Sequence, residues 1–156
     1  MQKITTHLWF DSQAEDAVEL YTSVFGDSRV TRVQRYGAVG PGPEGTVMTI
    51  NFELAGQEFI ALNGGPEFPF TEAISLYVDC ASQQEVDELW ARLSAGGQEG
   101  PCGWLKDRFG LSWQIVPRVL TDLLSDQDPA ASGRVMKAML GMGKLDIQAL
   151  REAHAG

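Results

Sequence analysis

The pattern of apolar and polar positions repeats itself along the chain. An apolar run that ends in Asp occupies residues 4–11, and a second such run occupies residues 73–79. Each run is followed by apolar positions at helical spacing, over 12–26 in the first copy and 82–97 in the second. The sequence therefore predicts the same strand and helix twice, with a site built between the two copies.

The two predicted helices share their start and stop signals. Each opens with a capping box, Ser12-x-x-Glu15 in the first and Ser82-x-x-Glu85 in the second. In this motif the hydroxyl and the carboxylate satisfy backbone N–H groups that the first helical turn leaves unpaired. Both helices close on glycine, so the pattern predicts their ends as well as their starts.

Further strands are predicted after each helix, because runs rich in Val, Ile, Thr and Phe alternate with turn residues. In the first copy they occupy 28–36, 46–54 and 57–63. In the second copy GPCGW interrupts the strand pattern over 98–106, and a final strand follows at 111–116. Each copy therefore reads as βαβββ.

A glycine- and proline-rich segment, 37–45, separates two predicted strands of the first copy. A loop that binds phosphate must lead into the N-terminus of a helix, and this one has strands on both sides. We expect a plain flexible loop.

The chain after Pro117 is predicted to be helical. A short amphipathic helix covers 118–125, Asp128 caps a second helix that reaches about 141, and Asp146 caps a third that runs through 153. This tail carries an apolar ridge at helical spacing: Val135, Met136, Met139, Leu140 and Met142. Methionines of this kind usually fill gaps in packing, and the alternatives are that the ridge closes the pocket or covers a subunit interface.

Composition narrows the class of protein. A chain of 156 residues can bury roughly two thirds of its unfolded surface in one core, so a single domain is expected. The net charge of −9, without a Lys/Arg cluster, disfavours nucleic acid as a partner. The sequence shows neither a leader signal nor a membrane span, so we expect a cytoplasmic protein that does not enter membranes. Cys80 and Cys102 are expected to be reduced thiols.

With βαβββ read twice, the chain resembles the vicinal oxygen chelate superfamily, which includes glyoxalase I, bleomycin-resistance proteins and extradiol dioxygenases. Within it the chain is most similar to the PhnB-like group, often labelled demethylubiquinone methyltransferase-like. The resemblance rests on these segments, in order: LWFDSQAEDAVELYTSVFGDSRV, RYGAVGPGPEGTVMTINFEL, FIALNGGPEF, EAISLYVDC, GWLKDRFGLSWQIVP and, as a subgroup extension, DPAASGRVMKAMLGMGKLDI.

This resemblance implies an α+β fold in which two βαβββ modules form an open, cupped β-barrel around a pocket. Module one would cover about 1–66, module two about 67–117, and a helical tail 118–156. The resemblance also implies a homodimer.

In metal-dependent members of the superfamily, His, Gln or Glu on the first and last strand of each module holds the cation. The resemblance puts Ala73 and Gln114 in those places in module two. Aligning the first strands by their terminal Asp places Thr5 opposite Ala73 and His7 opposite Ser75. Alanine cannot bind a metal.

In module one either Ala61 or Asn63 would take the place of the metal-binding glutamate. The remaining candidate ligands, His7, Asn63 and Gln114, are all neutral, and a site without an anionic ligand holds a divalent cation poorly. We therefore expect no metal and no other cofactor.

Strand alternation predicts which side chains face the pocket, since successive residues point to opposite faces. With Gln114 inward, the inward set also contains Ser75, Tyr77, Ser112 and Val116, and His7 shares its face with Trp9. The predicted ligand-binding residues are His7, Trp9, Asn63, Tyr77, Trp104 and Gln114. Aromatic walls with a few hydrogen-bonding groups suit a planar organic small molecule.

Groups for metal-free catalysis are sparse, and no catalytic residue is assigned. Cys102 has no neighbouring His in sequence, and His154 lies in the last predicted turn. Asp11 and Asp79 end strands beside helix starts, where a carboxylate is ordinarily structural. A methyl-donor nucleotide site usually has a glycine-rich turn between a strand and a helix, whereas Gly64-Gly65-Pro66 runs into EFPF. The methyltransferase label finds no support in the residues.

Two function classes remain open. The first is metal-independent binding of a planar organic ligand. The alternative is a metal-dependent isomerase, lyase or dioxygenase of the vicinal oxygen chelate type, with missing ligands supplied by the partner chain or by water. Ala73 and Gln114 favour binding, while His7 keeps the enzyme hypothesis open.

Overall fold

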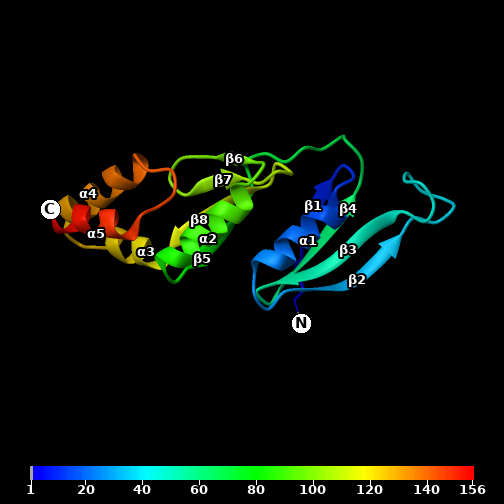
Figure 1. The fold of residues 1–156 in the computed structure, drawn as a ribbon, viewed down its shortest axis with the longest axis horizontal. Helices are drawn as coiled ribbons and strands as arrows, with labels where there is room; N and C mark the ends of the chain where they lie inside the picture. The colour runs from blue at the N-terminus through cyan, green and yellow to red at the C-terminus, as the bar shows by residue number, and fades with distance from the viewer. Residues whose placement is uncertain (1) are drawn as a thin grey trace. The chain divides into compact units, whose positions relative to one another are not determined.

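The computed structural model describes residues 2–156. These form two compact units, one that ends at Phe70 and one that spans Thr71–Gly156. The order strand, helix and three strands occurs in both units (Figure 1). The predicted α+β class and the repeated βαβββ order are confirmed. The strands form two four-stranded sheets rather than a closed barrel in the described chain, so the cupped barrel stays a prediction.

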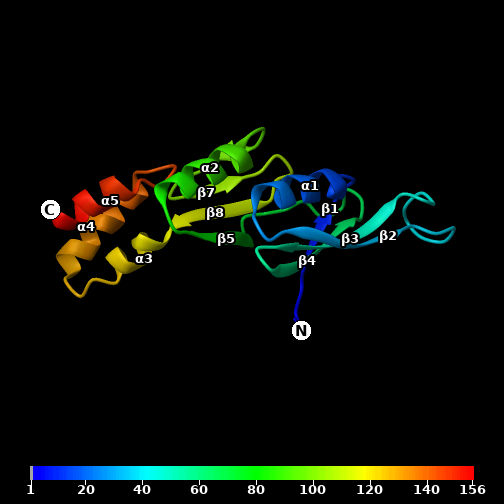
Figure 2. The same ribbon diagram turned by 60° about the horizontal axis from the view of Figure 1, so that its bottom comes forward.

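Unit 1 places one helix on a four-stranded sheet (Figures 1 and 2). Its elements are β1 (Thr6–Phe10), α1 (Ala14–Val24), β2 (Arg29–Arg35), β3 (Val47–Leu54) and β4 (Gln57–Asn63). The strand order is β1-β4-β3-β2, with β1 parallel to β4 and the other neighbours antiparallel.

The sheet of unit 1 has one covered face and one face away from the helix. On the covered face Phe52 and Phe59 are cross-strand partners whose rings stack with centroids 5.5 Å apart. The predicted apolar side of α1 is buried at Ala14, Ala17, Val18 and Tyr21. Burial of this stripe, more than helix propensity, holds α1 in place.

The predicted capping box of α1 is wrong. The helix starts at Ala14 with Gln13 at the N-cap position, and no N-cap side chain bonds to the first turn. Asn63, at the end of β4, caps the helix instead, because its Oδ1 accepts the Ala14 N–H at 2.8 Å. Its Nδ2 donates to Glu15 Oε1 at 2.6 Å and to the Val47 carbonyl at 3.1 Å. One amide thus joins α1, β3 and β4.

Unit 2 repeats the pattern and adds three helices. Its elements are β5 (Ser75–Cys80), α2 (Gln83–Ser94), β6 (Gln98–Glu99), β7 (Trp104–Lys106), β8 (Ser112–Pro117), α3 (Arg118–Leu124), α4 (Pro129–Leu140) and α5 (Ile147–Ala155). The strand order is β5-β8-β7-β6, and β5 is parallel to β8. Here the sequence signal for the helix start is correct, because Ser82 Oγ accepts the Glu85 N–H at 3.1 Å.

The three C-terminal helices have a core of their own beside the end of β8. Val116 is buried in it with Leu120, Val135, Leu145 and Leu150. The prediction that Val116 faces a pocket is therefore wrong. Asp128 and Asp146 cap α4 and α5 as predicted.

The apolar ridge over 135–142 divides between two environments. Val135, Met139 and Met142 pack in this core, while Met136 and Leu140 are exposed. The ridge thus contributes to the packing of the C-terminal helices. Within residues 2–156, no helix combines the length and the apolar character that crossing a membrane requires.

We expect Asn63→Ala to lower the free energy of unfolding by about 2 kcal/mol, because three hydrogen bonds disappear and the Ala14 N–H loses its acceptor. Urea denaturation measures the change. Ser12→Ala is the control, and it should stay within about 0.5 kcal/mol of the parent chain because Ser12 does not cap α1. Equal losses in the two variants would contradict the Asn63 cap.

Candidate functional site

Three predicted ligand-binding residues form one row across the sheet of unit 2. Gln114 on β8 is the cross-strand partner of Trp104 on β7 and of Tyr77 on β5. Cross-strand partners point to the same face. The structure therefore brings Tyr77, Trp104 and Gln114 together on the face away from α2.

The next row on this face is polar. Ser112 on β8 has Lys106 and Ser75 as its cross-strand partners, and Lys106 in turn pairs with Gln98. Ser75 Oγ accepts a hydrogen bond from Gln114 Nε2 at 2.9 Å, which links the two rows.

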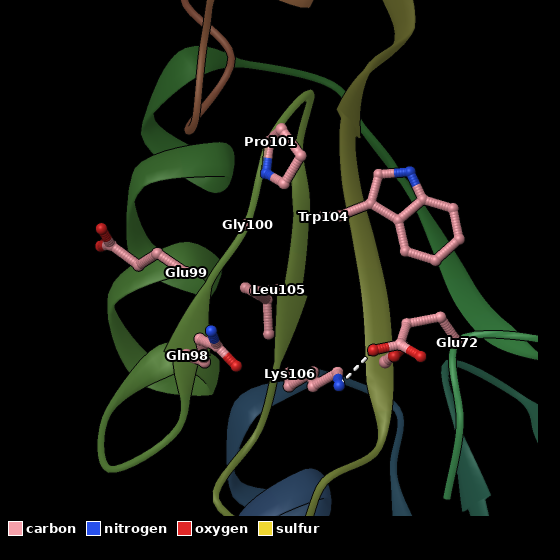
Figure 3. A pocket seen from close by; sticks show the side chains of 9 residues that line it. Glu72, Gln98, Glu99, Gly100, Pro101, Trp104, Leu105 and Lys106 are labelled. Carbon is pink, nitrogen blue, oxygen red and sulfur yellow. Dashed lines mark ion pairs between the residues drawn. The ribbon is translucent and has the colours of Figure 1, made fainter.

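A cavity of about 520 Å³ opens beside Trp104 (Figure 3). Its size is within the usual range for small-molecule sites. It is lined by Glu72, Gln98, Glu99, Gly100, Pro101, Trp104, Leu105, Lys106 and Ser112. Of the predicted residues, Trp104 lines this cavity. Gln114 and Tyr77 are its row neighbours outside the lining, and Tyr77 is 55% exposed.

Ser112 is the unusual member of the lining. It is 1% exposed, and its Oγ has no hydrogen-bond partner among residues 2–156. A buried hydroxyl without a partner costs roughly 1–3 kcal/mol, so such groups are rare in native proteins and point to a ligand or a function. Ser112 thus marks the polar end of the cavity.

The charged side chains of the lining have partners, one ion pair and one hydrogen bond. Lys106 Nζ forms an ion pair with Glu72, drawn in Figure 3. The hydrogen bond from Lys106 lowers the pKa of the Glu72 carboxyl below its ordinary value. Glu99 Oε1 accepts the indole N–H of Trp90 at 2.9 Å. Because the Lys106–Glu72 pair is exposed, a ligand can displace it at little cost.

Asp107 supports the site although the sequence motifs did not single it out. It is 2% exposed and lies in the turn between β7 and β8. Its carboxylate accepts the N–H groups of Phe109 and Leu111 and the indole N–H of Trp113, at 2.9, 3.1 and 2.9 Å. The sequence signal that could have identified Asp107 is the DRFG turn directly before a strand that contains Trp113.

In unit 1, His7 and Trp9 share the face away from α1, as alternation predicts, with Ile60 and Leu62 as their partners on β4. His7 is exposed. The indole N–H of Trp9 donates to the Gly65 carbonyl at 2.8 Å, and its ring meets Phe68 edge to face at 4.9 Å. These bonds hold Trp9 against the segment that follows β4.

Asn63 lies apart from His7 and Trp9. Its strand partner is Phe10, on the face that α1 covers, and its amide is engaged there. Asn63 instead lines a second cavity of about 380 Å³, which also contains Tyr36 and part of the 37–45 loop. The Tyr36 hydroxyl donates to the Asn63 carbonyl oxygen at 2.5 Å.

The donors at the superfamily's metal positions do not fit a divalent cation. Gln114 pairs with Tyr77 in unit 2, and in unit 1 Leu62 pairs with Trp9 in the same way. The unit 1 counterpart of Gln114 is therefore Leu62. The prediction that Ala61 or Asn63 takes this place is wrong. The counterpart of His7 is Ser75, whose Oγ already accepts from Gln114. A divalent cation prefers anionic or imidazole ligands in a group. In the described chain, no three His, Cys, Asp or Glu side chains gather closely enough to hold a metal ion.

The other reactive groups have structural surroundings. Burial raises the pKa of the Cys80 thiol to about 12, so this thiol stays protonated. His154 Nε2 lies 2.7 Å from Asp126 Oδ2 on the C-terminal helices. The backbone N–H of Asp128, and then His154, lowers the pKa of the Asp126 carboxyl. None of these groups lines the cavity beside Trp104.

Comparison with known proteins identifies the family. The family model described as 3-demethylubiquinone-9 3-methyltransferase matches residues 2–116. A solved structure from Bacillus cereus, provisionally named 3-demethylubiquinone-9 3-methyltransferase, PhnB protein, is 40% identical. The match covers 74% of this chain and 99% of that one, with a TM-score of 0.67.

Two further solved structures are more distant. Protein PA1353 from Pseudomonas aeruginosa is 18% identical over 75% of this chain and 98% of its own, with a TM-score of 0.63, and shares the fold. A lactoylglutathione lyase from Agrobacterium tumefaciens is 20% identical over 75% and 94%, but its TM-score of 0.36 is too low to show a common fold. A search of the curated proteins finds no match.

The family match spans both βαβββ units and ends before α3. The 40% identity to the Bacillus cereus PhnB protein over nearly all of that chain confirms the predicted likeness to the PhnB-like group. The chain belongs to the 3-demethylubiquinone-9 3-methyltransferase family, PhnB-like group.

Proposed function

We propose that the protein binds a planar organic ligand, without a metal, in the cavity beside Trp104. The single observation that carries this proposal is the unpartnered Ser112 Oγ in the lining of a cavity with an aromatic wall. A flat conjugated ring stacks on the Trp104 indole. An oxygen on that ring accepts a hydrogen bond from the Ser112 hydroxyl and so supplies the missing partner.

The ion pair beside Ser112 gives the ligand a route to this hydroxyl. Lys106 is the cross-strand partner of Ser112, and Glu72 binds the Lys106 ammonium at the surface. When the ligand displaces this pair, the Lys106 ammonium and the Ser112 hydroxyl both become donors to one oxygen. The preferred ligand is a planar ring that carries a carbonyl or ionised hydroxyl oxygen.

The family's name agrees with this ligand class. It names 3-demethylubiquinone, a quinone that carries a ring hydroxyl, as the compound on which the family acts. We take the ligand class from this name and leave the methyl transfer aside. Gly64 and Gly65 lead into a non-helical segment, 64–74, and so lack the helix N-terminus that a methyl-donor nucleotide would need.

The alternative, a metal-dependent isomerase, lyase or dioxygenase, finds little support in the side chains. Leu62, Ala73 and Gln114 stand at three of the positions where it needs ligands. Metal-independent binding agrees better with these residues. The homodimer expected from the wider superfamily is part of the proposal.

Native mass spectrometry of the purified protein tests the proposal directly. We expect a dimer without a stoichiometric metal, either bare or carrying an organic adduct. Isothermal titration with 2-hydroxy-1,4-naphthoquinone, a planar hydroxyquinone, then gives a dissociation constant. One tightly bound divalent cation per chain, or a protein that carries no adduct and does not bind the naphthoquinone, would overturn it.

Trp104→Ala should weaken naphthoquinone binding at least about tenfold, because the stacking surface is lost. Trp104→Phe keeps an aromatic face and should stay within about threefold of the parent chain. The two dissociation constants are compared by titration calorimetry. Equal affinity in the alanine variant and the parent would move the ligand away from Trp104.

Ser112→Ala should raise the free energy of unfolding of the free protein by about 1 kcal/mol, since it removes an unsatisfied buried hydroxyl, and should weaken naphthoquinone binding. Ser75→Ala is the matched control in the neighbouring strand. It should lower stability by about 1 kcal/mol, because Gln114 Nε2 loses its acceptor. Urea denaturation measures both changes, and a Ser112→Ala variant as destabilised as Ser75→Ala would contradict this role of Ser112.

A further inference from the structure

The segment between α4 and α5 contacts the loop that forms one wall of the cavity. The Cys102 N–H donates to the Met142 carbonyl, and the Gly103 N–H donates to the Gly143 carbonyl, both at 2.8 Å. The same loop contributes Gly100 and Pro101 to the cavity lining and leads directly into Trp104 (Figure 3). We call residues 142–145 the brace.

The backbone of this loop has a conformation that requires support. Cys102 has φ +57°, in the left-handed region that a residue with a Cβ seldom adopts, and Gly103 has φ +83°. A Cβ on Gly103 would come within 2.9 Å of both the Ile115 carbonyl oxygen and the Leu145 side chain. The loop is therefore packed between β8 on one side and the brace on the other.

Trp104 is connected to this conformation by short hydrogen bonds. Its own N–H donates to the Pro101 carbonyl at 3.0 Å, and its carbonyl accepts the Gly100 N–H at 2.9 Å. The Gly103 carbonyl accepts the Ile115 N–H at 2.7 Å. A shift of Cys102 and Gly103 would consequently move the backbone that carries the indole.

The brace itself is fixed to α2. Gln83 Nε2 donates to the Leu145 carbonyl at 3.0 Å, and Gln83 Oε1 accepts the Ile147 N–H at 2.8 Å. Lys144 Nζ lies 2.9 Å from Asp87 Oδ1. Gln83 Nε2 also donates to Asp87 Oδ1 at 2.9 Å. This hydrogen bond, and then the one from Lys144, lower the pKa of the Asp87 carboxyl, so the carboxyl stays ionised. Leu145 is fully buried in the core of the C-terminal helices.

We propose that the C-terminal helices determine the ligand affinity of the cavity, because the brace holds the wall loop and thereby positions Trp104. Gln83 is a positioning residue that acts through the brace. This inference rests on the proposed function of the cavity. The family match ends at residue 116, so the brace lies outside the segment that the family model matches.

The test variant is Gln83→Ala with Lys144→Ala, which removes two bonds between α2 and the brace, together with the Gln83–Ile147 bond, and changes no residue of the cavity lining. The matched control is Gln84→Ala with Lys137→Ala. Gln84 is the neighbour of Gln83 on α2 and bonds to Glu88, and Lys137 is exposed on α4. Both full-length variants are checked by urea denaturation, and Lys144→Ala alone serves as a milder second variant.

Two readouts decide the outcome. Amide hydrogen exchange at Cys102, Gly103 and Trp104 should accelerate at least about tenfold in the test variant, relative to the amides of β3 and β4, and stay unchanged in the control. Naphthoquinone affinity should fall about fivefold in the test variant alone, because the binding conformation is less preorganised.

Faster exchange with unchanged affinity would overturn the proposal, and so would unchanged exchange. A parent chain that does not bind naphthoquinone would be a failure of the proposed function instead. In that case the exchange rates at Cys102, Gly103 and Trp104 decide whether the brace positions the tryptophan.

Discussion

The pairing register between β7 and β8 is the constraint on which the site in unit 2 depends. Asp107 fixes it, because its buried carboxylate accepts three N–H groups from the turn and from Trp113. A carboxylate removed from water requires such partners. A slip of one residue would turn Trp104 and Lys106 toward α2 and leave the opposite side chains on the cavity face. The cavity chemistry thus rests on one acidic side chain outside the cavity.

The sequence was sufficient wherever structure follows from neighbouring residues. The capping box of α2, the caps of α4 and α5, and the interruption of the strand pattern by GPCGW are all local, and all were predicted. The α1 cap was not, because its acceptor is Asn63 on a strand far along the chain. Ser12 has the right residue type but lies one position before the N-cap residue Gln13, and Asn63 on β4 accepts the first helical N–H instead.

For the candidate site too, the sequence predicted the local features and not those that depend on contacts between distant segments. Alternation with period two correctly grouped Ser75 and Tyr77 on one strand, and Ser112 and Gln114 on another. It could not assign the face of Asn63, because β1 and β4 pair across the whole of α1, β2 and β3, and the register of this distant pairing brings Leu62 beside Trp9. The cavity itself, the missing partner of Ser112 Oγ and the role of the C-terminal helices arise from contacts between distant segments, which the sequence pattern does not show.

The parallel pairing of first and last strand has a consequence for how the chain acquires its structure. In unit 1, Thr6 pairs with Phe59, and in unit 2, Ser75 pairs with Ser112. Neither sheet can be completed before its last strand has been synthesised. In each unit the entropy cost of bringing distant segments together comes before the stabilisation from strand pairing. Unit 2 then still lacks the brace, which follows β8, α3 and α4 along the chain, so its cavity wall is completed only after its sheet can form.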